Sequence, residues 1–289
     1  MIETIESTIR TVASAAGPSI VSIGRNGRGT GFVVGQDRVL TSAHNLRDQT
    51  VAITFADGRT EQASVHGVDA DGDVVVVSVP TGELPALSFA EVTLEVGGAV
   101  VALSRGGHRA RVTLGFISAQ DQAFRGPRGR VVHGSIEHTA PLARGSSGGP
   151  VCNAAGHVVG INTHRAGDGF YLARATDAAL QTRIAELLDG RSPQRRTLGV
   201  AIAPPQVATE LRQAVGLSDR TGLLVRGVEE SGPAAAAGVL VGDLLVLLGD
   251  TELISIDALA DGLARLATDT VELGVVRGAD DLSLTVSFA

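Results

Sequence analysis

The sequence predicts a mainly β protein with two domains, of which the first is all-β and the second is a smaller α+β domain. At 289 residues the chain fits two domains better than one, because single hydrophobic cores stop growing near roughly 250 to 300 residues. Hydrophobic residues make up 44% of the chain and charged residues 19%, which is typical of a globular protein. Aromatic residues make up only 3%, against 37 glycines, which indicates many turns and strands packed through small branched side chains.

The first domain shows short apolar runs that alternate with glycine, aspartate and asparagine. Many short strands at such spacing indicate an all-β sandwich or barrel. The runs that we expect to form strands are 19–23, 31–34, 38–40, 51–55, 74–79, 99–103, 112–117, 158–161 and 170–172. Apolar positions in 177–189 then recur at helical spacing and stop at Gly190, so we expect a helix at the end of this domain.

A polar stretch that contains Pro193 follows this helix and has the composition of a linker. We therefore expect a first domain over 1–190, a linker over 191–196 and a second domain over 197–289. In the second domain the apolar pattern mixes strands with helices, which indicates a small α+β fold. The expected strands are 223–228, 244–248, 270–276 and 282–288, and the expected helices are 205–215 and 256–266.

Charge and cysteine content exclude several functions. The net charge of -7 argues against a general nucleic-acid binder, because such binding depends on clustered basic residues that neutralise phosphates. The single cysteine, Cys152, excludes an intramolecular disulfide and a cysteine-based metal cluster, and we expect it to be a buried small hydrophobe. The sequence shows neither a signal peptide nor an apolar stretch long enough to span a bilayer, so it leaves the compartment unknown.

Ser147 is a candidate nucleophile because it lies in the segment 145–150, Gly-Ser-Ser-Gly-Gly-Pro. A serine hydroxyl needs a base, an acid that orients the base, and donors for the oxyanion that forms. Glycines permit a turn that directs successive N–H groups at one point. We expect the oxyanion hole at Gly145, Ser146 and Ser147, with the N–H groups of Gly145 and Ser147 as donors. Taken alone, such a serine is more often only part of a turn.

His44 is the best candidate for the base, since it directly follows a short apolar strand in a run of small residues. Asp73 precedes the all-valine run 74–77, so its carboxylate can sit at a strand edge facing the imidazole. It would then fix the tautomer of His44 and stabilise the imidazolium. Each residue alone has a structural alternative, and Asp69 and Asp71 compete with Asp73 for the carboxylate role.

The order His, Asp, Ser and the surrounding motifs resemble those of trypsin-like serine proteases, and the whole chain resembles the HtrA (Deg) proteases. The motifs are Gly-Thr-Gly-Phe at 29–32, Thr-Ser-Ala-His at 41–44, the aspartate segment 69–73 with Val74, the nucleophile segment 145–150 and Gly-Ile-Asn-Thr at 160–163. The resemblance implies a trypsin-like double six-stranded antiparallel β-barrel, with the triad His44, Asp73 and Ser147 in the cleft between the barrels.

The sequence departs from this pattern in informative ways. Ser146 stands where relatives often carry Asn or Asp, and its side chain is not part of the triad. The segment 139–144 carries no acid where the resemblance places the floor of the specificity pocket, so we expect no preference for Arg or Lys. We expect cleavage after small or medium aliphatic residues. The expected pocket residues are Pro141, Leu142, Ile161 and Asn162. The remaining neighbours receive no catalytic role, with Arg144 expected to be solvated, His138 structural, and the loop 123–130 unassigned.

The segment 196–202, Arg-Thr-Leu-Gly-Val-Ala-Ile, is similar to the carboxylate-binding loop and adjoining strand of a PDZ domain, and the second domain resembles this family. A glycine-containing turn can present N–H groups to a peptide C-terminus, and an open strand edge can accept the peptide as an extra strand. The alternative is a purely structural or regulatory domain in which the apolar positions of 256–266 are plain core. The residues expected to bind a peptide C-terminus are Thr197, Leu198, Gly199, Val200, Ile202, Leu259 and Leu263.

The resemblance implies an ATP-independent serine endopeptidase that cleaves misfolded or exposed polypeptides in protein quality control, with the PDZ domain recruiting substrates or regulating cleavage. It implies neither a cofactor nor a metal, and a periplasmic, extracellular or membrane-anchored location. Relatives often form trimers through N-terminal aromatic residues, but 1–31 contains none, so the homo-oligomeric state stays open. Two alternatives remain, a catalytically silent PDZ-containing peptide-binding scaffold and an esterase or acyl-transfer enzyme that uses the same triad.

Overall fold

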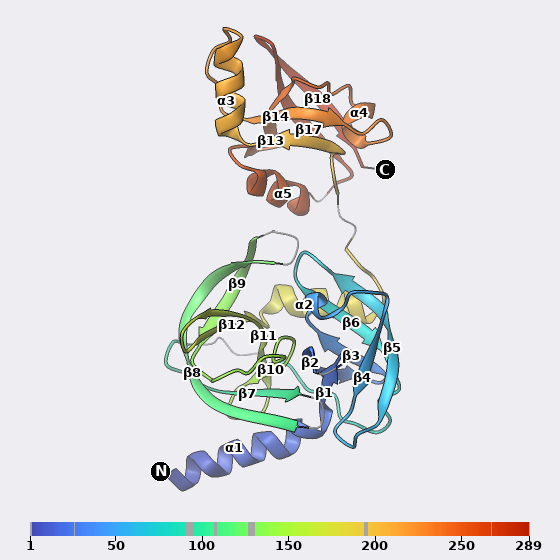
Figure 1. Ribbon diagram of the computed structural model, residues 1–289, viewed down its shortest axis with the longest axis vertical. Helices are drawn as coiled ribbons and strands as arrows, with labels where there is room; N and C mark the ends of the chain where they lie inside the picture. Colours follow the sequence, from blue (N-terminus) through green and yellow to red (C-terminus); the bar gives the residue numbers. More distant parts are fainter. Residues whose placement is uncertain are drawn as a thin grey trace. The chain divides into compact units, whose positions relative to one another are not determined.

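The computed structural model describes residues 2–25, 27–90, 95–106, 109–126, 131–193, 196–266 and 268–288. The chain divides into two compact units, 1–193 and 194–289 (Figure 1). The division falls within the stretch 191–196 that the sequence analysis expects to be a linker.

The first unit consists of two closed barrels, and the described part of the chain supplies six antiparallel strands to each. This confirms the expected double six-stranded barrel. The first barrel has the strand order β1 (Ile20–Ile23), β2 (Gly29–Gly35), β3 (Arg38–Thr41), β6 (Val74–Ser78), β5 (Thr60–Asp69) and β4 (Thr50–Thr54). The second has the order β10 (Pro150–Cys152), β11 (Val158–Gly167), β12 (Phe170–Ala175), β9 (Val131–His138), β8 (Arg109–Arg125) and β7 (Ala99–Gly106).

Every apolar run expected to form a strand in the first domain overlaps an observed strand. The sequence analysis missed β5, β9 and β10. In β5 only Ala63 and Gly67 are buried, so its apolar signal is weak, whereas β10 is a strand of three buried residues directly after the nucleophile turn.

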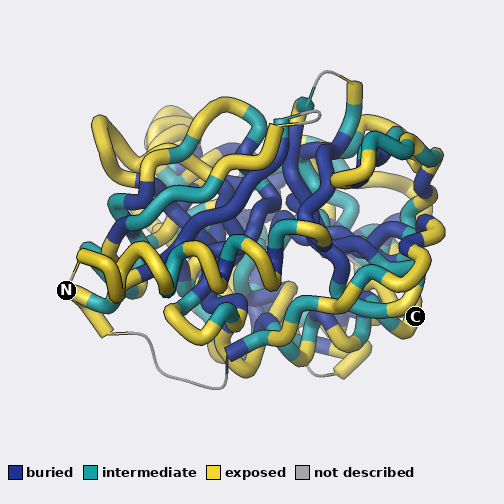
Figure 2. Tube along the Cα trace, turned by 90° about the horizontal axis from the view of Figure 1, so that it is seen from below, coloured by how far each residue is buried: buried dark blue, intermediate teal, exposed yellow. Residues whose placement is uncertain are grey.

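The helix α2 (Ala178–Leu188) lies where periodicity predicted it. The side chain of Asp177 caps it by accepting a hydrogen bond from the N–H of Leu180, and Gly190 follows its end with φ +78°. A second helix, α1 (Ile2–Ala16), was not predicted. Only Val12 and Ala16 of α1 are buried, and most of its trace is exposed in Figure 2.

The valines of β6 show how the barrels share a core. Val74 and Val76 belong to a cluster that combines strands of both barrels with the buried face of α2, including Leu103, Ile161 and Leu187. The alternate residues Val75 and Val77 pack inside the first barrel. Because successive side chains of a strand point to opposite faces, one all-valine strand serves both cores. This shared packing fixes the positions of β6 and β10, and of the residues next to them in the chain, relative to each other.

The second unit is a small sheet with helices, as expected for a PDZ domain. Its strands are β13 (Val200–Ala203), β14 (Leu223–Val228), β15 (Leu244–Leu248), β16 (Thr251–Glu252), β17 (Thr270–Arg277) and β18 (Asp280–Ser287). The sheet order is β13-β14-β15-β17-β18, and β16 pairs with β15. The helices are α3 (Pro205–Ala214), α4 (Pro233–Ala236) and α5 (Ile256–Arg265). Across the described residues, none of the helices has the length and apolar character needed to cross a membrane.

Candidate active site

His44 and Asp73 meet because their strands are neighbours in the first barrel. β3 pairs with β6, and His44 lies in the short 3-10 helix Ala43–Asn45 just after β3, whereas Asp73 directly precedes β6. Asp73 adopts the left-handed conformation with φ +56°, which aspartate tolerates better than most residues. The backbone N–H of Ala43 donates to the carbonyl of Asp73 and fixes the approach of the two segments.

The carboxylate of Asp73 is fully buried and is held by three donors. Its oxygens lie 2.8 Å and 3.0 Å from Nδ1 of His44, Oδ1 also accepts the backbone N–H of His44 at 3.0 Å, and Oδ2 accepts the hydroxyl of Thr163 at 3.3 Å. An ionised carboxylate only accepts hydrogen bonds, so Nδ1 carries the proton. Nε2 then holds a lone pair, which is the tautomer that a general base needs.

The competing carboxylate Asp69 has other partners. It accepts the N–H of Gly72 within its own turn and pairs with Arg183 of α2 at 3.5 Å. The imidazole of His44 forms its carboxylate hydrogen bonds with Asp73. Geometry therefore favours Asp73 as the orienting acid.

The backbone of Ser147 is attached to the first barrel at two points. Its carbonyl accepts the N–H of Thr30 and the side-chain amide of Asn45, both at 2.9 Å. Asn45 is the residue after His44, so this amide links the nucleophile segment directly to the segment of the base. A Cβ on Gly29 would lie 2.3 Å from the Asn45 amide, which explains the glycine there.

The hydroxyl of Ser147 donates to the carbonyl of Thr163 at 2.8 Å. Both Ser147 and His44 lie in the described part of the chain, and no hydrogen bond joins their side chains there. A proton transfer from Ser147 to His44 would therefore require the Ser147 side chain to turn about its Cα–Cβ bond. In enzymes without bound substrate, catalytic hydrogen bonds are often long or poorly aligned and tighten only in the complex.

The turn before Ser147 leaves two N–H groups unused. The N–H of Ser146 closes the turn onto the carbonyl of Ala143 at 3.3 Å, and the carbonyl of Gly145 accepts the hydroxyl of Thr30 at 2.7 Å. Among the described residues, nothing accepts a hydrogen bond from the N–H of Gly145 or of Ser147. These two are candidate oxyanion donors. Ser146 lies between them with its own N–H engaged in the turn, so it is not a donor, in line with the expectation that Gly145 and Ser147 donate.

Gly145 can adopt this conformation only as glycine. Its φ is +83°, and a Cβ there would lie 2.2 Å from the carbonyl oxygen of Gly27. The close approach of the Gly27 carbonyl thus fixes the peptide that carries one of the candidate donors.

The four residues of the expected specificity pocket differ in how far they are buried. Pro141 is exposed and Leu142 is half-buried. Ile161, in contrast, is 1% exposed and belongs to the core shared by the barrels. The side chain of Asn162 is buried and its Oδ1 lies 3.0 Å from Nε2 of His138. Ile161 therefore packs in the shared core and Asn162 is hydrogen-bonded to His138, so these buried side chains give no support to the pocket assignment, which stays a prediction.

His138 and Cys152 have the character of structural residues. Burial lowers the pKa of His138 despite its hydrogen bond to Asn162, so the ring is neutral near pH 7. Burial raises the pKa of the Cys152 thiol to about 12, which makes it a poor nucleophile. Arg144 is exposed. The loop 123–130 lies partly outside the described residues, since 127–130 are not among them.

Sequence reasoning missed four residues of this site. Thr30 and Thr163 stand inside motifs that carried the resemblance but received no role, and Asn45 directly follows the candidate base. His164 had no sequence signal, yet its ring lies 5.7 Å from that of His44. Their roles depend on contacts between segments far apart in the chain.

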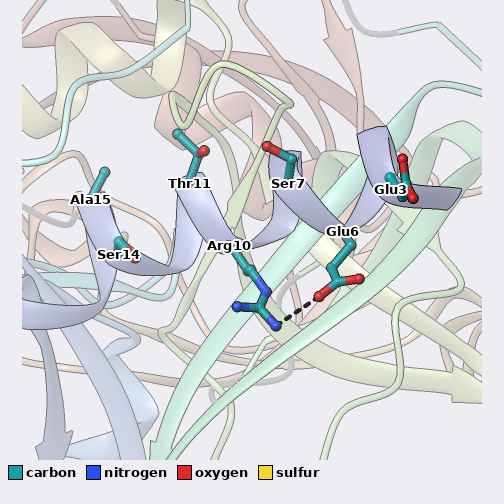
Figure 3. Close-up of a pocket in the computed structure, with 7 residues that line it drawn as sticks. All are labelled: Glu3, Glu6, Ser7, Arg10, Thr11, Ser14 and Ala15. Carbon is teal, nitrogen blue, oxygen red and sulfur yellow. Dashed lines mark ion pairs between the residues drawn. The ribbon is translucent and has the colours of Figure 1, made fainter. Parts of the chain in front are cut away.

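The pocket drawn in Figure 3 is separate from the candidate active site. All its lining residues belong to α1, where Arg10 and Glu6 form an ion pair at 2.7 Å, and none is a candidate site residue. No group of three or more His, Cys, Asp or Glu residues in the described ranges is arranged to hold a metal ion.

The second unit offers an edge strand beside a turn. β13 is the terminal strand of the sheet, and Gly199 before it has φ +72°. The carbonyls of Leu198 and Gly199 accept the N–H groups of Ala234 and Glu229, while their own N–H groups have no acceptor among the residues described. The side chain of Leu198 is buried at 2% exposure, so it can contribute only through its backbone.

Apolar side chains of β13 and α5 belong to one cluster. Val200 and Ile202 are half-buried and pack against the core that includes Leu259 and Leu263. Thr197 is exposed. The strand edge, the unused N–H groups and this apolar surface are the features that strand addition of a peptide requires.

Comparisons with known proteins find a matching family for each of the two units. The family model for the trypsin-like peptidase domain matches residues 29–161, and that for the PDZ domain matches 198–288. A probable periplasmic serine endoprotease, DegP-like, from Halomonas elongata is 32% identical over 273 residues, which cover 91% of this chain and 56% of that protein. A putative serine protease, HhoB, from Synechocystis sp. is 32% identical over 237 residues, covering 77% of this chain and 56% of that protein.

Solved structures show the same fold. An HtrA-type protease, AlgW, with a decapeptide has a TM-score of 0.72 at 23% identity, covering 96% of this chain and 97% of its own. A serine endoprotease from Yersinia pestis has a TM-score of 0.69 at 24% identity, with 96% of each chain covered.

Fold and motifs thus define a trypsin-like peptidase domain followed by a PDZ domain. Curated relatives of this chain are named DegP-like serine endoproteases, and structures of HtrA-type proteases share its fold. The chain spans about half the length of the curated relatives that it matches.

Proposed function

We propose that this chain is an ATP-independent serine endopeptidase that cleaves misfolded or exposed polypeptides. Ser147 acts as nucleophile, His44 as general base and later general acid, and Asp73 as the orienting acid, with the N–H groups of Gly145 and Ser147 stabilising the oxyanion. The observation that carries the proposal is the buried Asp73 carboxylate, which holds His44 in the tautomer of a base, while the neighbouring segment of Ser147 offers the unused N–H groups of Gly145 and Ser147.

Hydrolysis of casein by the wild-type chain and by Ser147→Ala tests this proposal. We expect the variant to lose activity by roughly 10⁴-fold or more, as for other serine nucleophiles. The matched control is Ser146→Ala, because the Ser146 hydroxyl is buried without a hydrogen-bond partner among the described residues and its N–H survives the change. A fluorophosphonate probe should label wild type and Ser146→Ala and fail to label Ser147→Ala.

The alternative is a catalytically silent scaffold. One observation favours it, because the hydroxyl of Ser147 donates to the carbonyl of Thr163. Equal inertness of wild type and Ser147→Ala toward casein and toward the probe would support the scaffold and reject the protease. Turnover of small esters without hydrolysis of casein would instead support an esterase.

For specificity, we propose cleavage after small or medium aliphatic residues, because 139–144 carries no acid that would bind a basic side chain and offers the apolar residues Pro141 and Leu142. A peptide library in which basic residues rank first at the cleaved position would reject this preference.

For the second unit, we propose that peptide C-termini with apolar side chains bind along β13. The unused N–H groups of Leu198 and Gly199 would receive the terminal carboxylate, and the apolar surface formed with α5 would receive the side chain. Such binding would recruit substrates or regulate cleavage.

Fluorescence polarisation with an apolar peptide tests this, as a free acid and as a C-terminal amide. Only the free acid should bind. Ile202→Arg should abolish binding, whereas Ala201→Arg is the control, since Ala201 is exposed on the opposite face of the same strand. Equal binding of acid and amide would reject the carboxylate site.

A further inference from the structure

His164 lies beside the candidate triad without belonging to it. It is a residue of β11, directly after Thr163, and its ring centroid is 5.7 Å from that of His44. The ring also packs on Phe124 of β8 at 4.7 Å, and Phe124 is buried against Leu172 and Val132. The residue is exposed, and its imidazole contacts a ring on each of two sides.

One hydroxyl connects His164 to Asp73. The Oγ1 of Thr163 is 2.7 Å from Nδ1 of His164 and 3.3 Å from Oδ2 of Asp73. A hydroxyl has a single hydrogen, so it can donate to only one of the two. The buried, ionised carboxylate is the stronger acceptor, and the hydroxyl donates to it when Nδ1 of His164 carries a proton and donates to Oγ1.

We propose that His164 is a positioning residue that acts through Thr163, because its Nδ1–H turns the Thr163 hydroxyl toward Asp73 and so fixes the carboxylate that orients His44. This rests on the function proposed for the triad. We call this chain of hydrogen bonds, from His164 through Thr163 and Asp73 to His44, the relay. Each donor in it faces an acceptor.

The surroundings of His164 keep its ring neutral at neutral pH. Partial burial lowers its pKa, the neighbouring His44 lowers it further, and Asp73 acts in the opposite direction. His44 and Asp73 are the titratable groups that act on it, whereas the guanidinium of Arg165, the next residue of its strand, lies over the ring of Tyr171. A neutral ring beside His44 does not oppose the imidazolium that forms on His44 during catalysis.

Three variants test the relay in the full chain. His164→Phe keeps the stack on Phe124 and removes the nitrogen, Thr163→Val removes the hydroxyl, and His164→Asn keeps a polar atom near the position of Nδ1. We expect His164→Phe and Thr163→Val each to lower kcat on a peptide substrate by about tenfold with KM unchanged, the effect of one hydrogen bond to a charged group. His164→Asn should recover most of the loss.

Non-additivity and the pH profile separate positioning from a structural role. The double variant should be no slower than Thr163→Val alone, because both changes break the same relay. His164→Phe should also shift the acid limb of the kcat–pH profile, because it changes the hydrogen bonding of the Asp73 carboxylate that orients His44. His157→Phe is the control, as His157 is exposed outside the site, and it should match wild type. Wild-type kcat in His164→Phe, or fully additive losses, would overturn the relay.

A readout independent of activity completes the test. The ¹⁵N chemical shifts of the imidazoles in Ser147→Ala should show the neutral His164 protonated at Nδ1, and Thr163→Val should remove that preference. A neutral His164 protonated at Nε2 would overturn the proposal. If wild type neither hydrolyses peptide nor reacts with the fluorophosphonate probe, the proposed function fails, and these shifts alone decide the relay.

Discussion

The buried carboxylate of Asp73 accepts both the ring Nδ1–H and the backbone N–H of His44. The backbone hydrogen bond fixes the position of the His44 main chain, and the ring hydrogen bond fixes the orientation of the imidazole. One acid therefore controls position and tautomer together.

Replacing this acid by its amide tests that control. Asp73→Asn keeps the size of the side chain, but its NH₂ group allows Nδ1 to lose its proton, which leaves Nε2 protonated and unable to act as a base. We expect kcat to fall by roughly 10⁴-fold at neutral pH. Peptide hydrolysis measures the loss, and circular dichroism checks the fold. Asp69→Asn is the control and should stay within a fewfold of wild type, because Asp69 pairs with Arg183 away from His44.

The candidate oxyanion hole predicts different effects for two glycines with positive φ. A Cβ at Gly145 meets the Gly27 carbonyl oxygen at 2.2 Å, whereas a Cβ at Gly156 meets nothing within 4 Å. Both changes to alanine should destabilise the chain by about 1 to 2 kcal/mol through the left-handed backbone, and Gly145→Ala by more because of its clash with the Gly27 carbonyl. Only Gly145→Ala should lower kcat, by about 100-fold or more, because it displaces an oxyanion donor. Equal kcat values for the two variants would contradict this assignment.

The thiol of Cys152 should be inert in the folded chain. Its side chain is fully buried and its pKa is raised to about 12, so at pH 8 only about 1 in 10⁴ molecules would carry a thiolate. We expect no alkylation by iodoacetamide under native conditions and complete alkylation in urea, measured by mass spectrometry. In a Ser14→Cys variant one of the two thiols should react at once, since Ser14 is exposed on α1.

In the second unit, an ion pair should make stability depend on pH. The side chain of Asp243 is 1% exposed and accepts two hydrogen bonds from Arg277, at 2.8 Å and 2.7 Å. Burial raises the pKa of Asp243, but the hydrogen bonds from Arg277 and from the N–H of Leu240 outweigh it, and the pKa lies below its ordinary value of 3.8. The stabilisation is thus fully present above pH 3.8 and is lost as the pH falls through the lower, folded value.

Asp243→Asn should accordingly lower the free energy of unfolding of this unit by about 1.5 to 3 kcal/mol at pH 7. The difference from wild type should shrink below pH 4. Hydrogen exchange of β15 and β17, followed against denaturant at several pH values, measures it for this unit alone. Asp281→Asn removes an exposed pair with Arg220 and should cost less than about 1 kcal/mol. A difference that stays constant down to pH 2 would refute the pH dependence.

Local patterns predicted most elements of the fold and the three residues of the candidate triad. The helix 177–189 was readable because its periodicity, its Asp177 cap and Gly190 all agree. The helix α1 was missed because it contributes only two buried residues, and β5 because most of its positions are polar or half-exposed. Elements with one clear apolar face can be predicted from the sequence, whereas elements stabilised mainly by their neighbours cannot.

The sequence by itself determined that Ser147, His44 and Asp73 stand in motifs whose residue types suit nucleophilic catalysis, and that a PDZ domain follows. Only the tertiary structure decided which N–H groups near Ser147 are unused, that Ile161 and Asn162 face the interior, and that His164 contacts Thr163 beside the triad. The reason is physical. Residue types and local spacing fix what a segment can do, whereas a hydrogen bond between segments a hundred residues apart depends on how two barrels pack against each other.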